Sequence, residues 1–381
     1  GKYIEDHYES LMLYVHNQFN EKIKEKSKTD IEKERKKLTY VSKELRNQCN
    51  QSLKKYFSNS RPKILHLYIL FLKNVKDYLK IEGIDITSSI ERVSKNIKSN
   101  KIEFEDLGAL IYLYYRIYGS SNFDKYRHAV VDEAQDFGEL NFYALKKIMP
   151  KSTFSIFGDL SQSIYQYRGI KNWNDVIDTI FNGNCELKYL RKSYRTTTEI
   201  MNSANNITKH LGLITAEPVI RHGVDVKYSN VDNRLGDFLI PILDKYIEKG
   251  YKSIGIISKD VEESDKINQL LVNSGISVNK ITTANEEYHG GICTITSQLA
   301  KGLEFDGVII TDASEKRFSS INPIDMKLLY VSMTRPLHEL NVLYNGELTK
   351  PLLDDLKSKD NNKQEEYPNI YNELINTNNL E

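Results

Sequence analysis

Two adjacent carboxylates, Asp132 and Glu133, follow directly on an apolar run in the segment HAVVDEAQD. Burying an unpaired carboxylate is costly, so acids at the end of a strand usually hold a metal ion or act on a substrate. One of the pair could bind Mg²⁺ while the other orients or deprotonates water for ATP hydrolysis. The alternative is structural, because acidic residues also favour the first turn of a helix. Taken alone, the pair is compatible with both interpretations.

A second β-like run leads into a polar and aromatic turn at residues 157–169, FGDLSQSIYQYRG. Gln162 could contact a terminal phosphate from such a strand end. Tyr167 could stack on a base, which grips single strands with little regard to sequence. For Tyr165 and Tyr167 the alternative is packing in a hydrophobic core.

Three later segments carry cations that could meet a triphosphate. Tyr194 and Arg195 in LRKSYRTTTEIM place a flat ring beside a guanidinium, which suits an adenine and a γ-phosphate. The run Lys301-Gly302-Leu303-Glu304 precedes the β-like EFDGVIITD. Arg335 follows the apolar LLYVSMT, where it could act as an arginine finger in cis. By itself, an arginine in this position is more often a surface salt-bridge partner.

The elements that must position these residues change character along the chain. Up to about residue 118, apolar residues recur at three- and four-residue spacing, which predicts helices. From about residue 126, short apolar β-like runs each lead into a turn and a helix, which predicts parallel sheets covered by helices. One of these runs is CELKYLRKSYR at residues 185–195. In such sheets the working loops lie at the carboxyl ends of the strands, where the polar clusters stand.

Residues 20–48 alternate Lys and Glu densely, which predicts a solvated helix face with i,i+4 pairs; a nucleic-acid or partner-protein arm is the alternative. Composition adds little, because 53 basic residues balance 52 acidic ones for a net charge of +1 over 381 residues. Any basic groove must therefore be local. The cysteines, Cys49, Cys185 and Cys293, form no metal-ligand pair and fit a reducing cytoplasm. No run is long enough to cross a bilayer.

In this order and spacing, the segments resemble motifs of the UvrD/Rep-like superfamily 1 helicases. VVDEAQD resembles motif II, GDLSQSIYQYRG motif III, SYRTT motif IV, AKGLEF motif V and LLYVSMTRP motif VI, so that the likeness covers about residues 126–345. ITSQLAKGLEFDGVIIT and the long helical region before motif II most resemble the helicase IV/HelD branch. That branch includes motors that act on DNA and on RNA polymerase.

The resemblance implies an α/β fold of RecA-like P-loop NTPase cores with parallel sheets. The expected division is an α-helical arm over 1–118, a partial first core over 119–183, a second core over 184–351 and a polar tail over 352–381. The implied ligands are ATP, Mg²⁺ and single-stranded DNA, with RNA polymerase as an alternative partner. Neither oligomeric state nor translocation direction leaves a signal in the sequence.

The resemblance also implies a role for each matching residue. Those expected at the reacting phosphate are Asp132 as the Mg²⁺ ligand, Glu133 as the residue that activates water, and Gln162, Arg195 and Arg335 at the γ-phosphate. Those expected around the rest of the nucleotide are Tyr194 on the adenine, Glu304 on the ribose and Gly302 in the same loop. Those expected at the DNA are Tyr167, Arg168 and Gln298, the last standing where many relatives have His.

A phosphate-cradling G-x-x-x-x-G-K-[ST] loop is missing, since no Lys followed by Ser or Thr is preceded by Gly. The chain starts at Gly1 and ends in Leu380-Glu381, and we expect it to be the carboxyl part of a longer motor that does not hydrolyse ATP alone. An RNA-polymerase-remodelling ATPase and a non-catalytic scaffold that lost its phosphate loop are the alternatives. The clustered unpaired charges argue against a scaffold.

Overall fold

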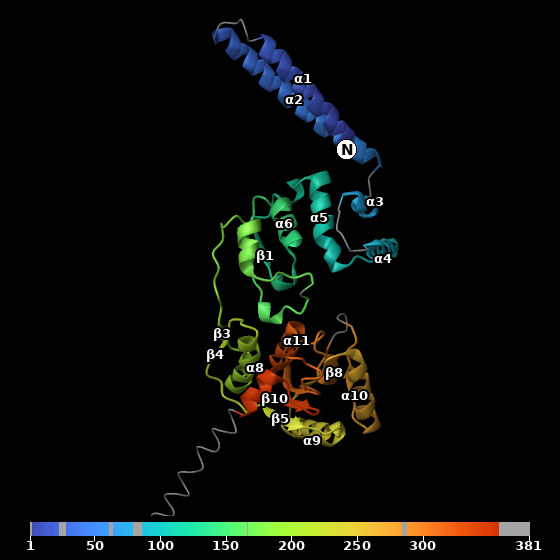
Figure 1. The fold of residues 1–381 in the computed structure, drawn as a ribbon, viewed down its shortest axis with the longest axis vertical. Helices are drawn as coiled ribbons and strands as arrows, with labels where there is room; N and C mark the ends of the chain where they lie inside the picture. Colours follow the sequence, from blue (N-terminus) through green and yellow to red (C-terminus); the bar gives the residue numbers. More distant parts are fainter. Residues whose placement is uncertain are drawn as a thin grey trace, which may run out of the picture. The chain divides into compact units, whose positions relative to one another are not determined.

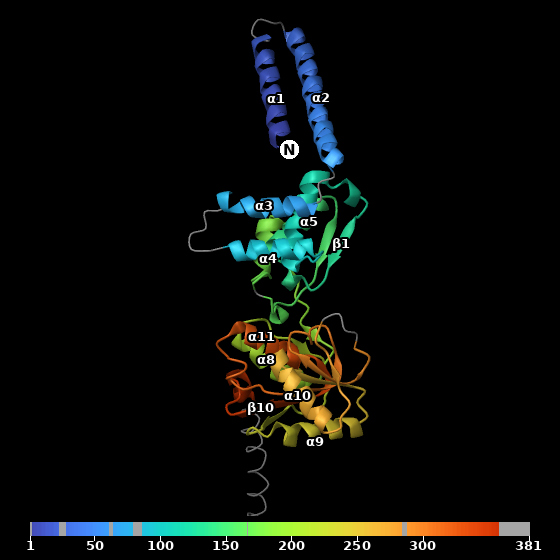
Figure 2. The same ribbon diagram turned by 90° about the vertical axis from the view of Figure 1, so that its right-hand side faces the viewer.

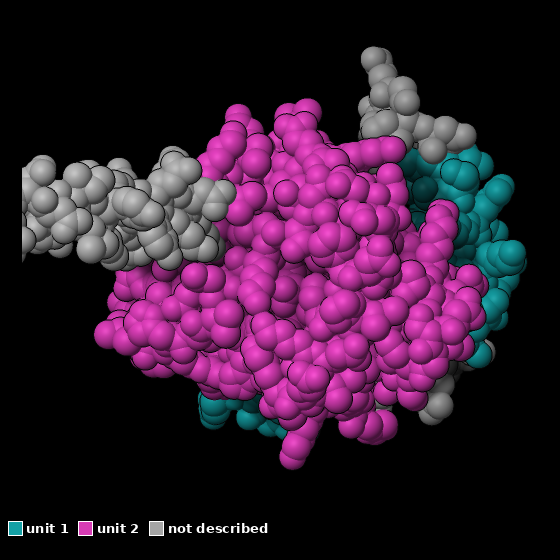
Figure 3. All heavy atoms as spheres, turned by 90° about the horizontal axis from the view of Figure 1, so that it is seen from below, with its two compact units in different colours: residues 1–127, 140–152 teal, residues 128–139, 153–381 magenta. Residues whose placement is uncertain are grey.

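The computed structural model describes residues 2–22, 28–60, 64–78, 86–165, 167–283 and 288–357. The chain divides into two units by its internal contacts (Figure 3). Unit 1 consists of residues 1–127 and 140–152, and unit 2 of residues 128–139 and 153–381. The expected partial first core is thus split, because its two strands belong to unit 2 whereas most of the helix between them belongs to unit 1.

Unit 1 is built from helices, as the apolar spacing before residue 118 predicts. They are α1 (Lys2–Lys22), α2 (Lys28–Ser60), α3 (Ile64–Tyr78), α4 (Thr87–Lys98), α5 (Phe104–Tyr118), the short η1 (Ser121–Phe123) and most of α6 (Glu139–Ile148). Helices α1 and α2 lie side by side (Figures 1 and 2). On α2, Lys36 and Glu32 form an exposed i,i+4 pair at 3.9 Å, as expected for a solvated helix face. Residues 23–27 of the Lys/Glu-rich stretch lie outside the described residues.

A small hydrophobic core joins α3, α4 and α5. Tyr68, Val93, Ile97 and Leu110 are buried together there. The Tyr68 hydroxyl donates a 2.8 Å hydrogen bond to Oδ1 of Asp106. Burial and then this hydrogen bond raise the pKa of Tyr68, so the phenol stays protonated and keeps α3 attached to α5.

Unit 2 contains a six-stranded sheet in which every neighbouring pair is parallel. Its strands, in spatial order, are β5 (Lys227–Asn230), β10 (Pro336–Tyr344), β9 (Phe305–Ile310), β6 (Ser253–Ser258), β8 (Gly291–Thr296) and β7 (Asn279–Lys280). The predicted α/β fold with parallel sheets is confirmed. The Val/Ile-rich runs become central strands because both of their faces are buried.

Helices cover both faces of this sheet. They are α8 (Thr198–His210) and α11 (Pro323–Met333) in one core, and α9 (Leu235–Glu248) and α10 (Val261–Asn273) in the other. Along β9, Val308 and Ile310 join the first core, whereas Ile309 joins the second. This alternation of side chains holds the strand between two layers of helices, so the loops at its ends are firmly placed.

A separate two-stranded parallel sheet carries motifs II and III. Strand β1 (His128–Val131) pairs with β2 (Thr153–Ile156), in register from His128 opposite Thr153 to Val131 opposite Ile156. Within the described residues β1 has no other partner strand, and Val130 is 65% exposed. The short η2 (Ala134–Asp136) follows β1 and η3 (Leu160–Gln162) follows β2; α7 (Trp173–Asp175) and the π-helical η4 (Val176–Ile180) come next.

Two stretches differ from the sequence-based expectation. Over residues 185–195 only β3 (Lys192–Ser193) forms, paired with β4 (Glu217–Pro218), and Leu190 is 87% exposed. Among the described residues no strand pairs with residues 185–190, so the apolar spacing there has no partner strand. Residues 350–357 are helical, which the expectation of a solvated helix or a loose end after about residue 351 allows, but Leu352 is buried in the core beside α8. Residues 358–381 lie outside the described residues.

Candidate functional site

The loop after β1 presents the paired carboxylates to solvent. The backbone of Phe157 bonds on both sides of this loop: its N–H donates to the Val131 carbonyl at 2.8 Å, and its carbonyl accepts from the Ala134 N–H at 2.9 Å. Between these bonds, Asp132 Oδ1 accepts from the Glu133 N–H at 2.8 Å. Glu133 has φ 51°, a left-handed conformation that is unusual for a residue with a side chain. The surrounding bonds hold this turn and expose both acids at the carboxyl end of the strand.

A fully buried glutamine, Gln135, holds the Glu133 side chain by a hydrogen bond. Its Nε2 donates to Glu133 Oε2 at 2.5 Å, and its Oε1 accepts from the Asp159 N–H at 3.0 Å. Gly158 makes this approach possible, because a Cβ at Gly158 would lie 2.6 Å from Gln135 Oε1. The sequence-based search missed Gln135; its signal was a polar residue in the middle of the acidic motif.

Asp159 fixes the orientation of Gln162. Its Oδ1 accepts from the Ser161 N–H at 2.8 Å and its Oδ2 accepts from Gln162 Nε2 at 3.0 Å. The amide oxygen of Gln162 therefore points away and accepts a 3.2 Å hydrogen bond from Arg335 Nη2. Motif III and motif VI are thus directly connected inside unit 2.

Arg335, which follows α11, is a buried cation held by neutral groups. It is 1% exposed, and it donates to the Val331 carbonyl at 3.0 Å and to the Leu303 carbonyl at 3.3 Å. Burial, followed by the positive charge of Arg195, lowers the pKa of Arg335 to about 10, against the opposing effect of the Glu133 and Glu304 carboxylates. The Arg195 and Arg335 guanidinium groups repel each other. A polyanion bound between them would remove this repulsion and would itself be stabilised by both charges.

The second cation, Arg195, lies in an exposed ion pair. Its Nε is 2.8 Å from Glu304 Oε1, and both side chains are nearly half exposed. Gly302 turns the chain just before Glu304 with φ 87°, a region that favours glycine. The neighbouring Tyr194 ring is 69% exposed, so one of its faces is available to a ligand.

Lys301 ties this loop to the acids after β1. Its Nζ lies 2.7 Å from Asp136 Oδ2 and 3.3 Å from Glu133 Oε2, and its side chain is only 12% exposed. A second lysine, Lys327 on α11, has its pKa lowered by burial, while the charges of Asp159 and Asp136 act in the opposite direction. Lys301 stands in a recognisable sequence motif, but its partners could not be predicted, and nothing in the sequence pattern points to Lys327.

The predicted DNA-contacting residues gather around Tyr165. The Arg168 guanidinium carbon lies 4.0 Å from the Tyr165 ring centroid and 5.9 Å from that of Tyr167. Gln298 Nε2 donates to the Tyr165 hydroxyl at 3.1 Å, so the glutamine in the usual histidine position still contacts motif III. Tyr167 is 75% exposed and offers a ring to a flat partner.

The predicted residues thus fall into two groups. One contains acids, Arg195, Arg335 and Gln162, and the other contains Tyr167, Arg168 and Gln298 around Tyr165. Asp132 and Tyr194 make no side-chain contact with the other predicted residues beyond the Asp132 bond already given, within the part of the chain that the structure describes. No group of three or more His, Cys, Asp or Glu side chains in that part could hold a metal ion by itself.

Two protein-family models match the sequence of this chain. The family model described as the UvrD/REP helicase N-terminal domain matches residues 3–176, and the UvrD-like helicase C-terminal domain matches residues 240–347. The chain belongs to the UvrD/Rep-like family of superfamily 1 helicases. The N-terminal match includes motifs II and III, and the C-terminal match includes motifs V and VI.

Individual relatives of this UvrD/Rep-like chain are distant and longer. A probable DNA helicase II homolog of Mycoplasma capricolum subsp. capricolum is 31% identical over 126 residues, 30% of this chain and 16% of that protein. The ATP-dependent DNA helicase PcrA of Bacillus subtilis is 24% identical over 197 residues, 49% of this chain and 27% of that protein. The matched part of the chain thus spans about a quarter or less of each relative's length.

A solved structure shows a partial likeness. The C-terminal domain of a possible DNA helicase from Lactobacillus plantarum WCFS1 is 27% identical, covers 42% of this chain and 92% of that domain, and has a TM-score of 0.35. Among the helices that the structure describes, none has the length and apolar character needed to span a bilayer.

Proposed function

We propose that this chain is the motor portion of an ATP-dependent superfamily 1 DNA helicase or translocase of the helicase IV/HelD type, working in the cytoplasm and moving on single-stranded DNA. The observation that carries the proposal is the hydrogen bond between Gln162 and the buried Arg335. A glutamine at the end of one strand and a desolvated cation from another core provide two groups that a γ-phosphate could engage together. Such motors obtain catalysis from positioning and electrostatic stabilisation more than from covalent chemistry.

Asp132 suits the role of the Mg²⁺ ligand. It is exposed at the strand end, one of its oxygens accepts the Glu133 N–H, and its other oxygen has no partner among the described residues. Mg²⁺ commonly binds one or two carboxylates together with phosphate oxygens, so a single acid fits. When bound, Mg²⁺ would neutralise charge on the phosphate oxygens.

Glu133 is the residue that we propose orients and deprotonates the attacking water. Gln135 and Lys301 both contact its Oε2, which leaves Oε1 toward solvent as the acceptor for water. Lys301 holds the Glu133 carboxylate in place through their ion pair. Its bond to Asp136 anchors Lys301 while it does so.

Arg195 and Arg335 are proposed to stabilise the γ-phosphate. Burial, and after it the charge of Arg195, lowers the pKa of Arg335. A triphosphate between the two guanidinium groups would offset their repulsion. Tyr194 would stack on the adenine. Glu304, which is paired with Arg195, would accept a hydrogen bond from the ribose once the nucleotide draws Arg195 away.

Tyr167, Arg168 and Gln298 are proposed to contact single-stranded DNA. Tyr167 supplies the exposed ring for a base, and Arg168 lies near both tyrosine rings as a cation for the backbone. Gln162 and Tyr165 are only three residues apart and are both bonded to loops of the six-stranded sheet. A change at the phosphate would therefore shift the DNA-contacting residues.

The decisive experiment measures ATP hydrolysis stimulated by single-stranded DNA in the full-length gene product. Glu133→Gln should reduce kcat by about 10²- to 10⁴-fold, because it removes the base without removing the binding residues. Glu139→Gln, which changes an exposed acid in the same segment, is the matched control and should leave kcat unchanged. Equal turnover in the Glu133→Gln protein would rule out the proposed role.

Residues 1–381 contain no phosphate-cradling lysine loop, so we propose that they do not turn over ATP appreciably alone. Robust turnover by these residues that is sensitive to Glu133→Gln would contradict this. The same assay separates the two candidate partners. Stimulation by RNA polymerase instead of by single-stranded DNA would favour a polymerase-remodelling motor.

A further inference from the structure

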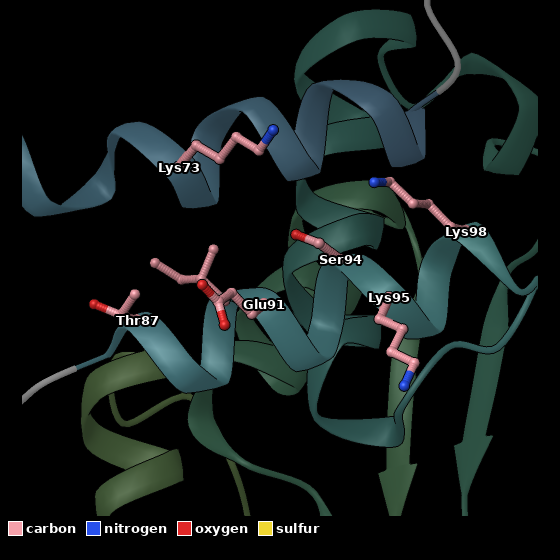
Figure 4. A pocket seen from close by; sticks show the side chains of 7 residues that line it. Lys73, Thr87, Glu91, Ser94, Lys95 and Lys98 are labelled. Carbon is pink, nitrogen blue, oxygen red and sulfur yellow. The ribbon is translucent and has the colours of Figure 1, made fainter.

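Charged side chains line pockets in both units, but they are arranged differently. The pocket between α3 and α4 in unit 1 carries Lys73, Lys95 and Lys98. Figure 4 shows Lys73 extended along α3 and the Lys95 ammonium group directed away from that helix, so these charges do not meet at one point. In a pocket of about 470 Å³ in unit 2, by contrast, the lining residues Arg221 and His338 are in direct contact.

Arg221 holds the backbone of motif IV from two sides. Its Nη1 donates a 2.7 Å hydrogen bond to the carbonyl of Arg195, and its own carbonyl accepts from the Thr198 N–H at 3.0 Å. Gly223 lets the chain after Arg221 come close to this turn, because a Cβ at Gly223 would lie 2.5 Å from Cγ2 of Thr197. The turn between β3 and α8 is therefore fixed by the segment around Arg221.

The same guanidinium group contacts His338 on β10. Its Nη2 lies 2.8 Å from Nδ1 of His338. Because an arginine only donates, Nδ1 must accept in this contact, and the proton of the neutral ring then stands on Nε2. Nε2 faces Oδ1 of Asp306 at 3.9 Å, which allows electrostatic attraction but is too long for a direct hydrogen bond. Arg221, His338 and Asp306 thus follow one another in a fixed order.

Two features fix the orientation of the His338 ring. Directly after Pro336 the alignment of β10 with β9 shifts, so that residues 337 and 338 stand opposite Asp306 alone. An inserted residue of this kind re-aims a side chain, and such insertions are frequent beside active sites. The ring also stacks on Tyr251, with ring centroids 5.8 Å apart and planes inclined by 22°.

Asp306, the last member of the order, is tied to the start of β6. Its Oδ2 accepts from the Lys252 N–H at 2.8 Å and from the Ser253 N–H at 2.9 Å. Burial raises the pKa of this carboxyl, but the hydrogen bonds from these two N–H groups and from the Ser253 hydroxyl outweigh it, so the net pKa is lowered. An ionised carboxylate thus faces Nε2 of His338.

These contacts reach three of the nucleotide-binding motifs. Arg221 bonds to Arg195 of motif IV itself. His338 follows Arg335 of motif VI by three residues, and Asp306 follows motif V directly. The loops of motifs IV, V and VI are therefore connected through one set of side chains.

Arg195 needs such support because its own side chain is weakly held. Its ion pair with Glu304 joins two groups that are nearly half exposed, and exposed pairs contribute little. Electrostatic stabilisation of a phosphate requires donors that are in place before the reaction, and a displacement of about 1 Å can cost about 100-fold in rate. The position of the Arg195 backbone consequently decides where its guanidinium group can reach.

We propose that Arg221 is a positioning residue for Arg195, and that His338, supported by Asp306, keeps Arg221 in place. Arg221 acts through the motif IV backbone and does not touch the nucleotide. The inference rests on the proposed function, in which Arg195 stabilises the γ-phosphate.

A double-mutant cycle in the full-length gene product tests the inference through ATP hydrolysis stimulated by single-stranded DNA. Arg221→Gln should lower kcat by about 10- to 100-fold and change KM for ATP by less than about threefold, because the lost alignment matters most in the transition state. In a protein that already carries Arg195→Gln, the same substitution should change kcat by less than about twofold. Arg191→Gln removes another half-exposed arginine close to motif IV, and as the matched control it should leave kcat unchanged.

The outcomes of this cycle separate the inference from the proposed function. If Arg195→Gln alone leaves kcat unchanged, Arg195 does not act at the phosphate, and the proposed role and the inference are both wrong. If Arg195→Gln lowers kcat and Arg221→Gln does not, the inference alone is overturned. An equal loss from Arg221→Gln with and without Arg195→Gln would also overturn it, because Arg221 would then act independently of Arg195.

Arg221→Lys distinguishes position from charge. A lysine keeps the positive charge but lacks the planar fork that donates to the Arg195 carbonyl and to His338 at the same time. We expect kcat between those of the Arg221→Gln and unmodified proteins. A Lys variant as fast as the unmodified protein would show that charge alone suffices, and would contradict the positioning role.

His338→Phe provides a second test that does not depend on the folding of Arg221 variants. Phenylalanine keeps a flat ring on Tyr251 but offers no acceptor to Arg221. We expect kcat to fall by about 3- to 10-fold, as for the loss of one hydrogen bond, and to fall no further when Arg195→Gln is already present. An unchanged kcat in a His338→Phe protein with an unchanged thermal unfolding midpoint would overturn the role of His338.

Discussion

Gln162 Oε1 accepts a 3.2 Å hydrogen bond from Arg335 Nη2, which joins residues that are 173 positions apart in the sequence. The guanidinium is otherwise held by backbone carbonyls and by the hydroxyl of Thr334. Gln162 is itself fixed by Asp159. The pair is therefore preorganised, so that a phosphate would meet donors whose positions are already set.

Arg335→Ala should lower the free energy of unfolding of unit 2 by about 2–4 kcal/mol. The substitution leaves the Leu303 carbonyl without its Arg335 donor and opens a cavity in a well-packed region. Urea unfolding followed by circular dichroism measures the change. Arg191→Ala is the control, because its ion pair with Glu217 is half exposed and should contribute less than about 1 kcal/mol. Equal effects of the two substitutions would contradict the structural role of Arg335.

Lys301→Met should reduce kcat of the full-length protein by about 10- to 100-fold with little change in KM. Without the ammonium group, Glu133 and Asp136 repel each other and the Glu133 carboxylate leaves its position, and small misplacements of this kind are costly to rate. Steady-state ATPase assays with saturating single-stranded DNA measure it. Lys316→Met removes an exposed lysine and serves as the control. A kcat within twofold of the unmodified protein would show that Lys301 does not position Glu133.

Tyr167→Ala should weaken the binding of single-stranded DNA by about 1–3 kcal/mol, because one base loses its stacking partner. Fluorescence anisotropy with a labelled oligonucleotide at fixed salt measures the loss. Tyr189→Ala removes another exposed tyrosine of unit 2, 56% exposed and outside the motifs, and should bind normally. If the two variants bind equally well, Tyr167 does not contact the strand.

Stability should decline in acid partly through Glu315. Burial raises the pKa of this carboxyl, but hydrogen bonds from the Ser320 and Lys350 N–H groups and from the Ser320 and Thr349 hydroxyls outweigh it, so the net pKa is lowered. The contribution is thus present above the unfolded-state pKa and is lost as the pH falls through the folded-state value. Urea unfolding of the unmodified protein and Glu315→Gln should differ at pH 7, and the difference should shrink between about pH 5 and pH 3. A constant difference would contradict this assignment.

Much of the fold could be predicted from the sequence, because the decisive patterns are local. The runs at residues 253–258, 291–296 and 305–310 are continuous and apolar, as central parallel strands require. The strand predicted over residues 185–190 does not form, because a strand also needs a neighbouring strand and apolar spacing does not provide one. Leu352 was assigned to a polar tail because the residues after it are polar, while its own burial depends on the distant α8.

The residues of the candidate site also divide into those that a local motif indicates and those whose roles depend on contacts across the fold. Asp132, Glu133, Gln162 and Arg335 can be proposed from the sequence because each stands in a recognisable motif. Gln135 and the partners of Lys301 were missed because their roles arise from contacts made across the fold, such as Gln135 with the Asp159 backbone. No spacing in a single sequence indicates that residues 24 positions apart share a buried hydrogen bond.

The two-stranded sheet that carries the acidic pair is too small to be stiff by itself. Val130 is 65% exposed on β1, so this ribbon has little packing of its own to resist bending. Two contacts with loops of the six-stranded sheet stabilise it, the ion pair of Lys301 with Glu133 and the hydrogen bond of Arg335 with Gln162. The positions of Asp132 and Glu133 consequently depend on these contacts, and a change in the loops that carry Lys301 or Arg335 would displace the two acids.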